Sequence, residues 1–282
     1  MKPNRAFRQV DVFTATPYRG NALAVVLDGD GLADEEMQRF ARWTNLSETT
    51  FLLPPRRAQA DYRVRIFTPG GELPFAGHPT LGSAHCWLEA GGAPKSSEFI
   101  VQECEVGLVR LRRDGTRLAF AAPSLRRAEC SAEVVAQLAA ALGIQTGRVL
   151  AAQVLDNGPV WFGLLLDSPA TVLGLMPDHG ELKRLGYKVG VAALYPAPAD
   201  GPQLEVRAFA APIGVAEDPV TGSLNASLAQ WLIEAGRLPA RYLAAQGACL
   251  ERAGRIHIQR DPQGQVWVGG DSVTCISGAV AL

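Results

Sequence analysis

Residues 77–83 read Gly77-His78-Pro79-Thr80-Leu81-Gly82-Ser83, and the chain repeats this stretch in looser form. The second copy, residues 217–223 (EDPVTGS), comes 140 residues later. At this spacing His78 corresponds to Asp218, so one copy carries an imidazole where the other carries a carboxylate. A repeat at a fixed spacing predicts two similar halves.

Each copy lies between a strand-like run and an amphipathic helix. Residues 62–67 precede the first copy and residues 204–209 precede the second. The two helices are expected to end at Ala90-Gly91 and at Ala235-Gly236. A strand, a loop and a helix that recur in this order predict a helix N-terminus at each motif.

The repeat divides the 282 residues into two predicted domains, residues 1–125 and 126–282, with the final strand free to cross back to the first. Each half has several strand patterns and one very apolar helix. This pattern favours an α+β fold over a doubly wound parallel fold. We therefore expect two pseudo-symmetric domains, each a curved, mostly antiparallel sheet wrapped around a central helix.

The other elements are predicted from hydrophobic periodicity and turn residues. Helices are expected at residues 34–43, 79–90, 131–142, 178–185 and after 222. Strands are expected at residues 10–13, 22–27, 49–53, 99–103, 107–112, 117–121, 160–166, 191–195, 256–259, 266–268 and 273–276. In this alignment of the halves Glu48 corresponds roughly to Gly190, so the carboxylate is expected in one half only.

Charge and hydropathy exclude several classes of function. Lys and Arg number 27 against 28 Asp and Glu, and no basic block stands out. Binding to nucleic acid or to an anionic membrane needs a concentrated positive face, so neither is expected. No run approaches the roughly 18 apolar residues of a spanning helix, and the start lacks the apolar core of a signal peptide. The sequence predicts a soluble, cytoplasmic protein.

Metal and disulfide chemistry are not expected either. The five cysteines and four histidines are dispersed along the chain, without CxxC, HxxxH or HExxH spacing. An odd, scattered set of cysteines argues against a disulfide framework and against a zinc site.

The motifs suggest acid/base chemistry on an anionic small molecule. Helix N-termini present free backbone N–H groups, which hold a carboxylate well. His78 and Asp218 could exchange protons with a bound molecule, and burial could raise the pKa of Glu48 enough to make it a base. Ser83 is expected to cap its helix locally. The residues alone leave the alternative open that Glu48 is a solvated strand-edge residue and His78 a helix cap.

Five motifs, taken in order, point to a known family. They are residues 11–14 (DVFT) with Gly20-Asn21 and 24–26 (AVV); 47–51 (SETTF); 65–69 (RIFTP) with Glu72 and 74–80 (PFAGHPT); 158–162 (GPVWF); and 217–223 (EDPVTGS). With these motifs the chain resembles, over essentially its whole length, the PhzF-like isomerases of phenazine biosynthesis. That family has the diaminopimelate-epimerase-like fold.

The resemblance implies a homodimer without a cofactor, whose active site lies in the cleft between the two domains. In the phenazine enzyme a glutamate moves a proton between ring carbons of a dihydro-hydroxyanthranilate. Carried over by motif, Glu48 is that acid/base, and His78 and Asp218 contact the substrate and assist the transfer. The implied substrate-binding residues are Gly77, Gly222, Ser223 and Ser47, and the backbone of the first three is expected to hold the carboxylate.

Two alternatives remain beside this assignment. One is an amino-acid or hydroxy-acid epimerase or racemase, although related epimerases carry cysteines where the motif alignment places His78 and Asp218. The other is a non-catalytic small-molecule-binding member of the family. The joint presence of Glu48, His78 and Asp218 favours an enzyme, because a binding protein needs none of the three. No GxGxxG, P-loop or GxSxG motif occurs in the context that would indicate another chemistry.

Overall fold

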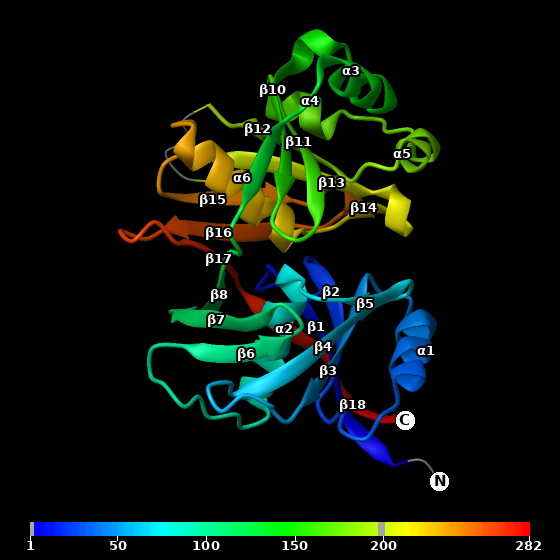
Figure 1. Ribbon diagram of the computed structural model, residues 1–282, viewed down its shortest axis with the longest axis vertical. Coiled ribbons are helices and arrows are strands. Elements are labelled where there is room, and N and C mark those ends of the chain that lie inside the picture. Colours follow the sequence, from blue (N-terminus) through cyan, green and yellow to red (C-terminus); the bar gives the residue numbers. More distant parts are fainter. Residues whose placement is uncertain (1–2, 197–200) are drawn as a thin grey trace. The chain divides into compact units, whose positions relative to one another are not determined.

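The computed structural model describes residues 3–196 and 201–282 (Figure 1). Its contacts divide the chain into two compact units, residues 1–121 with 269–282 and residues 122–268. The division falls at Ala121, where a strand ends, slightly before the boundary predicted at residue 125. The C-terminal segment belongs to the first unit because its strand pairs with the first strand of the chain.

The first unit is a sheet of consecutively paired strands. The strand order is β18–β1–β2–β3–β4–β6–β7–β8, with the short β5 also on β4. The β2–β3 and β4–β6 pairs are parallel and the others are antiparallel. The bounds are β1 (Asn4–Val12), β2 (Asn21–Val26), β3 (Glu48–Leu53), β4 (Tyr62–Thr68), β5 (Gly71–Leu73), β6 (Ile100–Cys104), β7 (Gly107–Asp114), β8 (Arg117–Ala121) and β18 (Ser272–Ala281).

Helix α2 (Gly77–Glu89) is enclosed by this sheet and contacts β1, β2, β3, β6, β8 and β18. Its residues from Gly77 to Ala84 are all buried, so the helix is covered on every side. Gly82 permits the close approach, because a Cβ there would lie 2.6 Å from the Leu23 side chain. Helix α1 (Asp34–Thr44) covers the other face of the sheet through Met37, Phe40 and Ala41.

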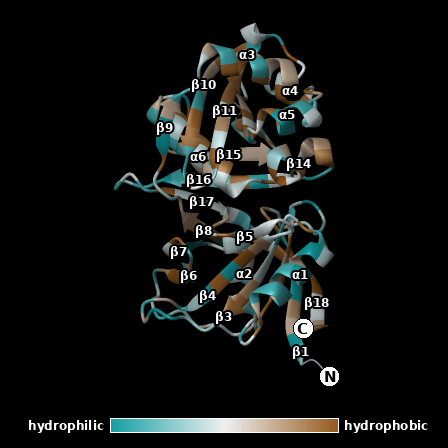
Figure 2. Ribbon diagram, turned by 45° about the vertical axis from the view of Figure 1, so that its right-hand side comes forward, coloured by the Kyte–Doolittle hydropathy of each residue, from teal (hydrophilic) through white to brown (hydrophobic). Residues whose placement is uncertain are grey.

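The second unit repeats this strand order. Its sheet runs β9–β10–β11–β12–β13–β15–β16, with the short β14 on β13 and with parallel β11–β12 and β13–β15 pairs. The bounds are β9 (Arg126–Glu129), β10 (Val149–Asp156), β11 (Val160–Leu166), β12 (Val189–Leu194), β13 (Leu204–Ala210), β14 (Val215–Asp218), β15 (Arg241–Gln246), β16 (Gly254–Arg260) and β17 (Val266–Gly270). Figure 2 shows β10 and β11 as mostly hydrophobic ribbons and α1 of the first unit as mostly hydrophilic.

Helix α6 (Gly222–Glu234) takes the place of α2, and its first eight residues are all buried. Helices α3 (Ala132–Ala141), α4 (Pro169–Leu173) and α5 (His179–Leu185) contribute to an apolar core with β11, β12 and β13. Ser131 caps α3 as expected, since its side chain accepts from the Val134 N–H. Each unit is thus a sheet around one helix with further helices outside, which confirms the predicted fold class.

Six strands and α-helices were not expected, namely β5, β9, β10, β14, β15 and α4. Strands β10 and β15 each contain two adjacent alanines, a residue that is depleted in strands, which weakens their strand pattern in the sequence. Ala235, expected to face inward, is the exposed C-cap of α6.

The correspondence drawn between His78 and Asp218 is also wrong. Helices α2 and α6 both have 13 residues and begin at Gly77 and Gly222, so their spacing is 145 residues rather than 140. The 3₁₀ turn Ala211–Ile213, inserted between β13 and β14, contributes to the longer spacing. By helix position His78 therefore matches Ser223, while Asp218 ends the preceding strand β14.

Candidate active-site residues

The first unit brings Glu48 and His78 together. Glu48 is the first residue of β3, and His78 is the second residue of α2. Oε2 of Glu48 lies 3.3 Å from Nε2 of His78, and their side chains are only 15% and 5% exposed. The imidazole makes no hydrogen bond through Nε2 to any described residue, so the 3.3 Å approach is a close contact without hydrogen-bond alignment.

A polar chain behind His78 defines its protonation. The Ser47 hydroxyl donates to Oδ1 of Asn21 at 3.3 Å, and Nδ2 of Asn21 lies 3.3 Å from Nδ1 of His78. An amide that donates to Nδ1 leaves the imidazole proton on Nε2, the nitrogen facing Glu48. Burial lowers the pKa of His78 to about 3, so the ring is neutral near pH 7. Neutral His78 thus offers an N–H group beside a carboxyl group.

Buried side chains hold the start of α2. Thr80 donates to the Ala76 carbonyl at 2.9 Å, and Gln102 donates to the Thr80 hydroxyl at 3.0 Å. Tyr62 in turn donates to Gln102 at 3.0 Å. The first N–H groups of a helix have no acceptor within the helix, so the Gly77 amide points out of its end.

Ser83 was expected to cap its own helix, α2, but it does not. It is the seventh residue of the helix, and its hydroxyl donates to Thr50 of β3 at 2.9 Å. The hydroxyl therefore ties the helix to the strand that begins at Glu48, and Ser83 is not part of the site.

In the second unit the candidate residues lie at the start of α6. Asp218, the last residue of β14, accepts a 2.5 Å hydrogen bond from the hydroxyl of Thr221, the N-cap residue. Gln246 of β15 accepts from the Thr221 N–H at 3.0 Å and donates to the Asp218 carbonyl at 3.0 Å. A buried glutamine from a neighbouring strand thus supports the helix start in each unit.

Ser223 is held by two further buried side chains. The indole N–H of Trp161 donates to its hydroxyl at 3.2 Å, and the Asn157 amide donates to its carbonyl at 2.9 Å. The backbone N–H groups of Gly222 and Ser223 belong to the first helical turn and are therefore free of helical acceptors. The Ser223 hydroxyl keeps its own proton to donate.

The sequence does not mark the residues that support these two helix starts. Asn21 and Trp161 lie inside quoted motifs, but their neighbours in space are distant in sequence. Nothing near Gln102 or Gln246 in the sequence marks either residue, because each acts across paired strands.

Neither helix start carries a cysteine that could act as an acid or a base. The N-caps are Ala76 and Thr221, and Cys86, the cysteine within α2, is buried three turns from the N-cap. Burial raises the pKa of Cys86 to about 12, so the thiol stays protonated.

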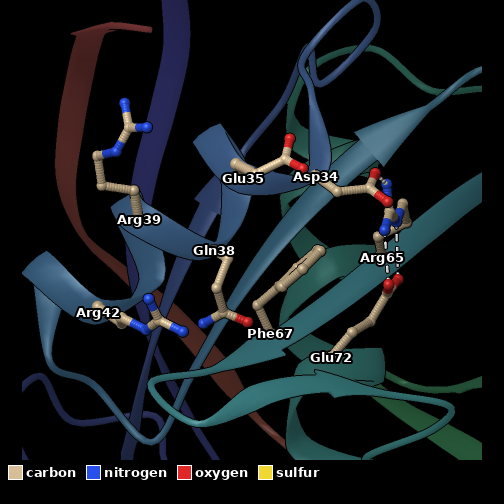
Figure 3. Close-up of a pocket in the computed structure, with 8 residues that line it drawn as sticks. All are labelled: Asp34, Glu35, Gln38, Arg39, Arg42, Arg65, Phe67 and Glu72. Atoms are coloured by element: carbon tan, nitrogen blue, oxygen red, sulfur yellow. Dashed lines mark hydrogen bonds and ion pairs between the residues drawn. The ribbon is translucent and has the colours of Figure 1, made fainter.

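A cleft of about 380 Å³ lies between α1, β4 and β5, and none of the candidate residues lines it (Figure 3). Arg65 makes two hydrogen bonds to Glu72, at 2.7 and 2.5 Å, and one to Asp34 at 2.5 Å. Its guanidinium also lies 5.0 Å from the centre of the Phe67 ring. Arg65, the cation at the centre of the cleft, is already neutralised by Glu72 and Asp34. We therefore assign this cleft a structural role, which is to join α1 to the β4–β5 hairpin.

Within residues 3–196 and 201–282, no group of three or more His, Cys, Asp or Glu side chains is arranged to hold a metal ion. Among the same residues, no helix has the length and apolar character needed to cross a membrane.

Comparisons with known proteins agree on one family. The model of the phenazine biosynthesis-like (PhzC-PhzF) family matches residues 10–278. A Schizosaccharomyces pombe protein named antisense-enhancing sequence 1 is 37% identical over 97% of both chains. Trans-2,3-dihydro-3-hydroxyanthranilate isomerase of Pseudomonas aeruginosa is 34% identical over 97% of this chain and 98% of its own.

Solved structures share the fold over the whole chain. A PhzF-family protein of Bacillus anthracis superimposes with a TM-score of 0.85 at 22% identity, covering 99% of this chain and 100% of its own. A probable proline racemase of Agrobacterium radiobacter gives a TM-score of 0.64 at 15% identity, covering 99% and 93%.

Proposed function

The chain belongs to the phenazine biosynthesis-like (PhzC-PhzF) family and is an isomerase, and we propose that Glu48 moves a proton between two carbons of its substrate. The contact between Glu48 and neutral His78 is the observation that carries this proposal. A carboxyl group is able to remove a proton from one carbon and to return it to another, so the reaction needs no oxidant or reductant.

His78 has a distinct part in this mechanism. When Glu48 takes the proton, negative charge develops on the substrate. An N–H donor aimed at that charge stabilises the transition state more than the bound substrate. The Nε2–H group of His78, oriented by Asn21, is the donor that we propose.

We propose that the substrate is a small carboxylated molecule similar to dihydro-hydroxyanthranilate, since a 34% identical relative carries that name. The amides of Gly77, Gly222 and Ser223 are proposed to hold it, and Ser47 to act through Asn21. Asp218 is proposed to bind a polar group of the same substrate. We propose that the protein is cytoplasmic and forms a homodimer, and light scattering in solution would test the homodimer.

The proposal is tested by proton NMR in deuterated water. The wild type and Glu48→Gln are incubated with dihydro-hydroxyanthranilate and with a panel of amino and hydroxy acids. Glu48-dependent isomerisation with solvent deuterium at a ring carbon is expected, and deuterium at Cα with inversion would instead identify an epimerase. Full activity of Glu48→Gln, with its fold unchanged by circular dichroism, would exclude Glu48 as the acid/base.

A further inference from the structure

Lys188 occupies in the second unit the place that Glu48 occupies in the first. Glu48 directly precedes Thr49, which pairs with Phe67 of β4. Lys188 directly precedes Val189, which pairs with Phe209 of β13. Because β3 and β12 have the same neighbours in the same order, the counterpart of Glu48 is Lys188 rather than Gly190 as the sequence suggested.

The side chain of Lys188 lies on the sheet face that α6 covers. A Cβ at Gly190 would meet the Leu224 side chain at 2.3 Å, so Gly190 faces α6. Side chains two residues apart on a strand share a face, which places Lys188 on the same side. Its Nζ lies 5.4 Å from the ring centre of Trp161, the residue that donates to Ser223.

The charge of Lys188 is not balanced inside the protein. Within the described part of the chain, the ammonium has the Trp161 ring as its neighbour and no hydrogen-bond or ion-pair partner. Burial lowers the pKa of Lys188, and no nearby carboxylate opposes that shift. An ammonium that is partly desolvated and unpaired costs free energy, which a bound anion would recover.

We infer that Lys188 determines specificity by binding the carboxylate of the substrate, together with the first turn of α6. This inference rests on the proposed function and assigns the groups that hold the carboxylate of the substrate. The carboxylate binds between Lys188 and the amides of Gly222 and Ser223, all in the second unit. Lys188 and Glu48 thus act as a cation and an acid/base at equivalent positions of two similar units.

A matched pair of ligands tests this assignment. 3-Hydroxyanthranilate is a stable aromatic analogue of the proposed substrate, and 2-aminophenol is the same ring without the carboxylate. Both are titrated by calorimetry into the wild type, Lys188→Met, Lys188→Arg and the control Lys183→Met, an exposed lysine of α5. We expect Lys188→Met to raise the Kd of 3-hydroxyanthranilate about tenfold to hundredfold, the usual effect of losing a charge-assisted hydrogen bond.

The second ligand, the other variants and the thermal midpoint each have their own expected result. Binding of 2-aminophenol should change less than about twofold in every variant, and Lys188→Arg should recover most of the lost affinity. Lys183→Met should bind both ligands as the wild type does. The thermal midpoint of Lys188→Met should stay equal or rise, because an unpaired ammonium is removed; a structural lysine would give a lower midpoint.

Three results would overturn the inference. They are unchanged binding of 3-hydroxyanthranilate by Lys188→Met, an equal loss of both ligands, and binding of neither ligand by the wild type. The proposed proton transfer is judged separately, by the Glu48-dependent deuterium exchange. Failure of one idea is therefore distinguishable from failure of the other.

Discussion

Arg207 and Glu217 form a buried, two-armed ion pair one residue before Asp218. Nε of Arg207 donates to Oε1 of Glu217 at 2.9 Å and an Nη donates to Oε2 at 2.8 Å. The two side chains are 6% and 8% exposed. Arg207 also donates to the carbonyls of Val172 and Leu175. Glu217 therefore anchors β14 to β13.

Removing one partner of this pair should be costly. We expect Glu217→Ala to lower the free energy of unfolding by about 3–5 kcal/mol, because it leaves the buried Arg207 uncompensated. Denaturant titration measures the loss. The matched control is Glu181→Ala, which breaks an exposed ion pair with Arg184 and should leave the unfolding midpoint nearly unchanged. Equal stabilities of the two variants would contradict this account.

Asn21 should control the tautomer of His78. In Asn21→Asp the new carboxylate can only accept, so it should draw the imidazole proton to Nδ1 and leave Nε2 without one. We expect kcat to fall about 10²-fold or more, the usual worth of a positioned proton donor. Nitrogen NMR of the imidazole ring reports the tautomer directly. A lower kcat with the proton still on Nε2 would refute the proposed link.

Stability should fall in mild acid because His78 is buried in its neutral form. Its pKa is about 3 in the folded protein against roughly 6.5 in the unfolded chain. The unfolded chain therefore binds the proton first, and stability present above pH 6.5 is lost progressively as the pH falls toward 3. Between pH 7.5 and pH 5.5 the loss is about 1.4 kcal/mol from this group.

The contribution of His78 is isolated by measuring the free energy of unfolding of the wild type and of His78→Gln at pH 7.5 and at pH 5.5. Glutamine does not titrate, so the variant should lose about 1.4 kcal/mol less over the same range. Parallel pH profiles for the two proteins would show that His78 does not contribute.

Replacing Gly82 by a larger residue should destabilise the contact between α2 and the sheet. A Cβ there would lie 2.6 Å from Leu23, 3.0 Å from Val12 and 3.1 Å from Val10. We expect Gly82→Ala to cost about 1–3 kcal/mol of unfolding free energy through overpacking. The matched control is Gly147→Ala, where an added Cβ meets nothing within 4 Å. A Gly82→Ala variant as stable as this control would show that the helix is able to shift freely.

Hydrophobic periodicity and the repeated motif were enough to predict the fold class and the helix after each motif. These features are local, because a strand, a helix or a helix start is encoded by neighbouring residues. The repeat spacing misled at one point. An inserted 3₁₀ turn changed the alignment, so Asp218 was matched to His78.

The sequence by itself determined two similar sheet-and-helix units and the residue types available for acid/base chemistry. Only the tertiary structure decided that Asn21 orients His78, that Arg207 neutralises Glu217, and that Lys188 stands unpaired beside Trp161. The reason is physical: hydrogen bonds, desolvation and unbalanced charge depend on which side chains meet across paired strands, and residues far apart in the chain make those contacts.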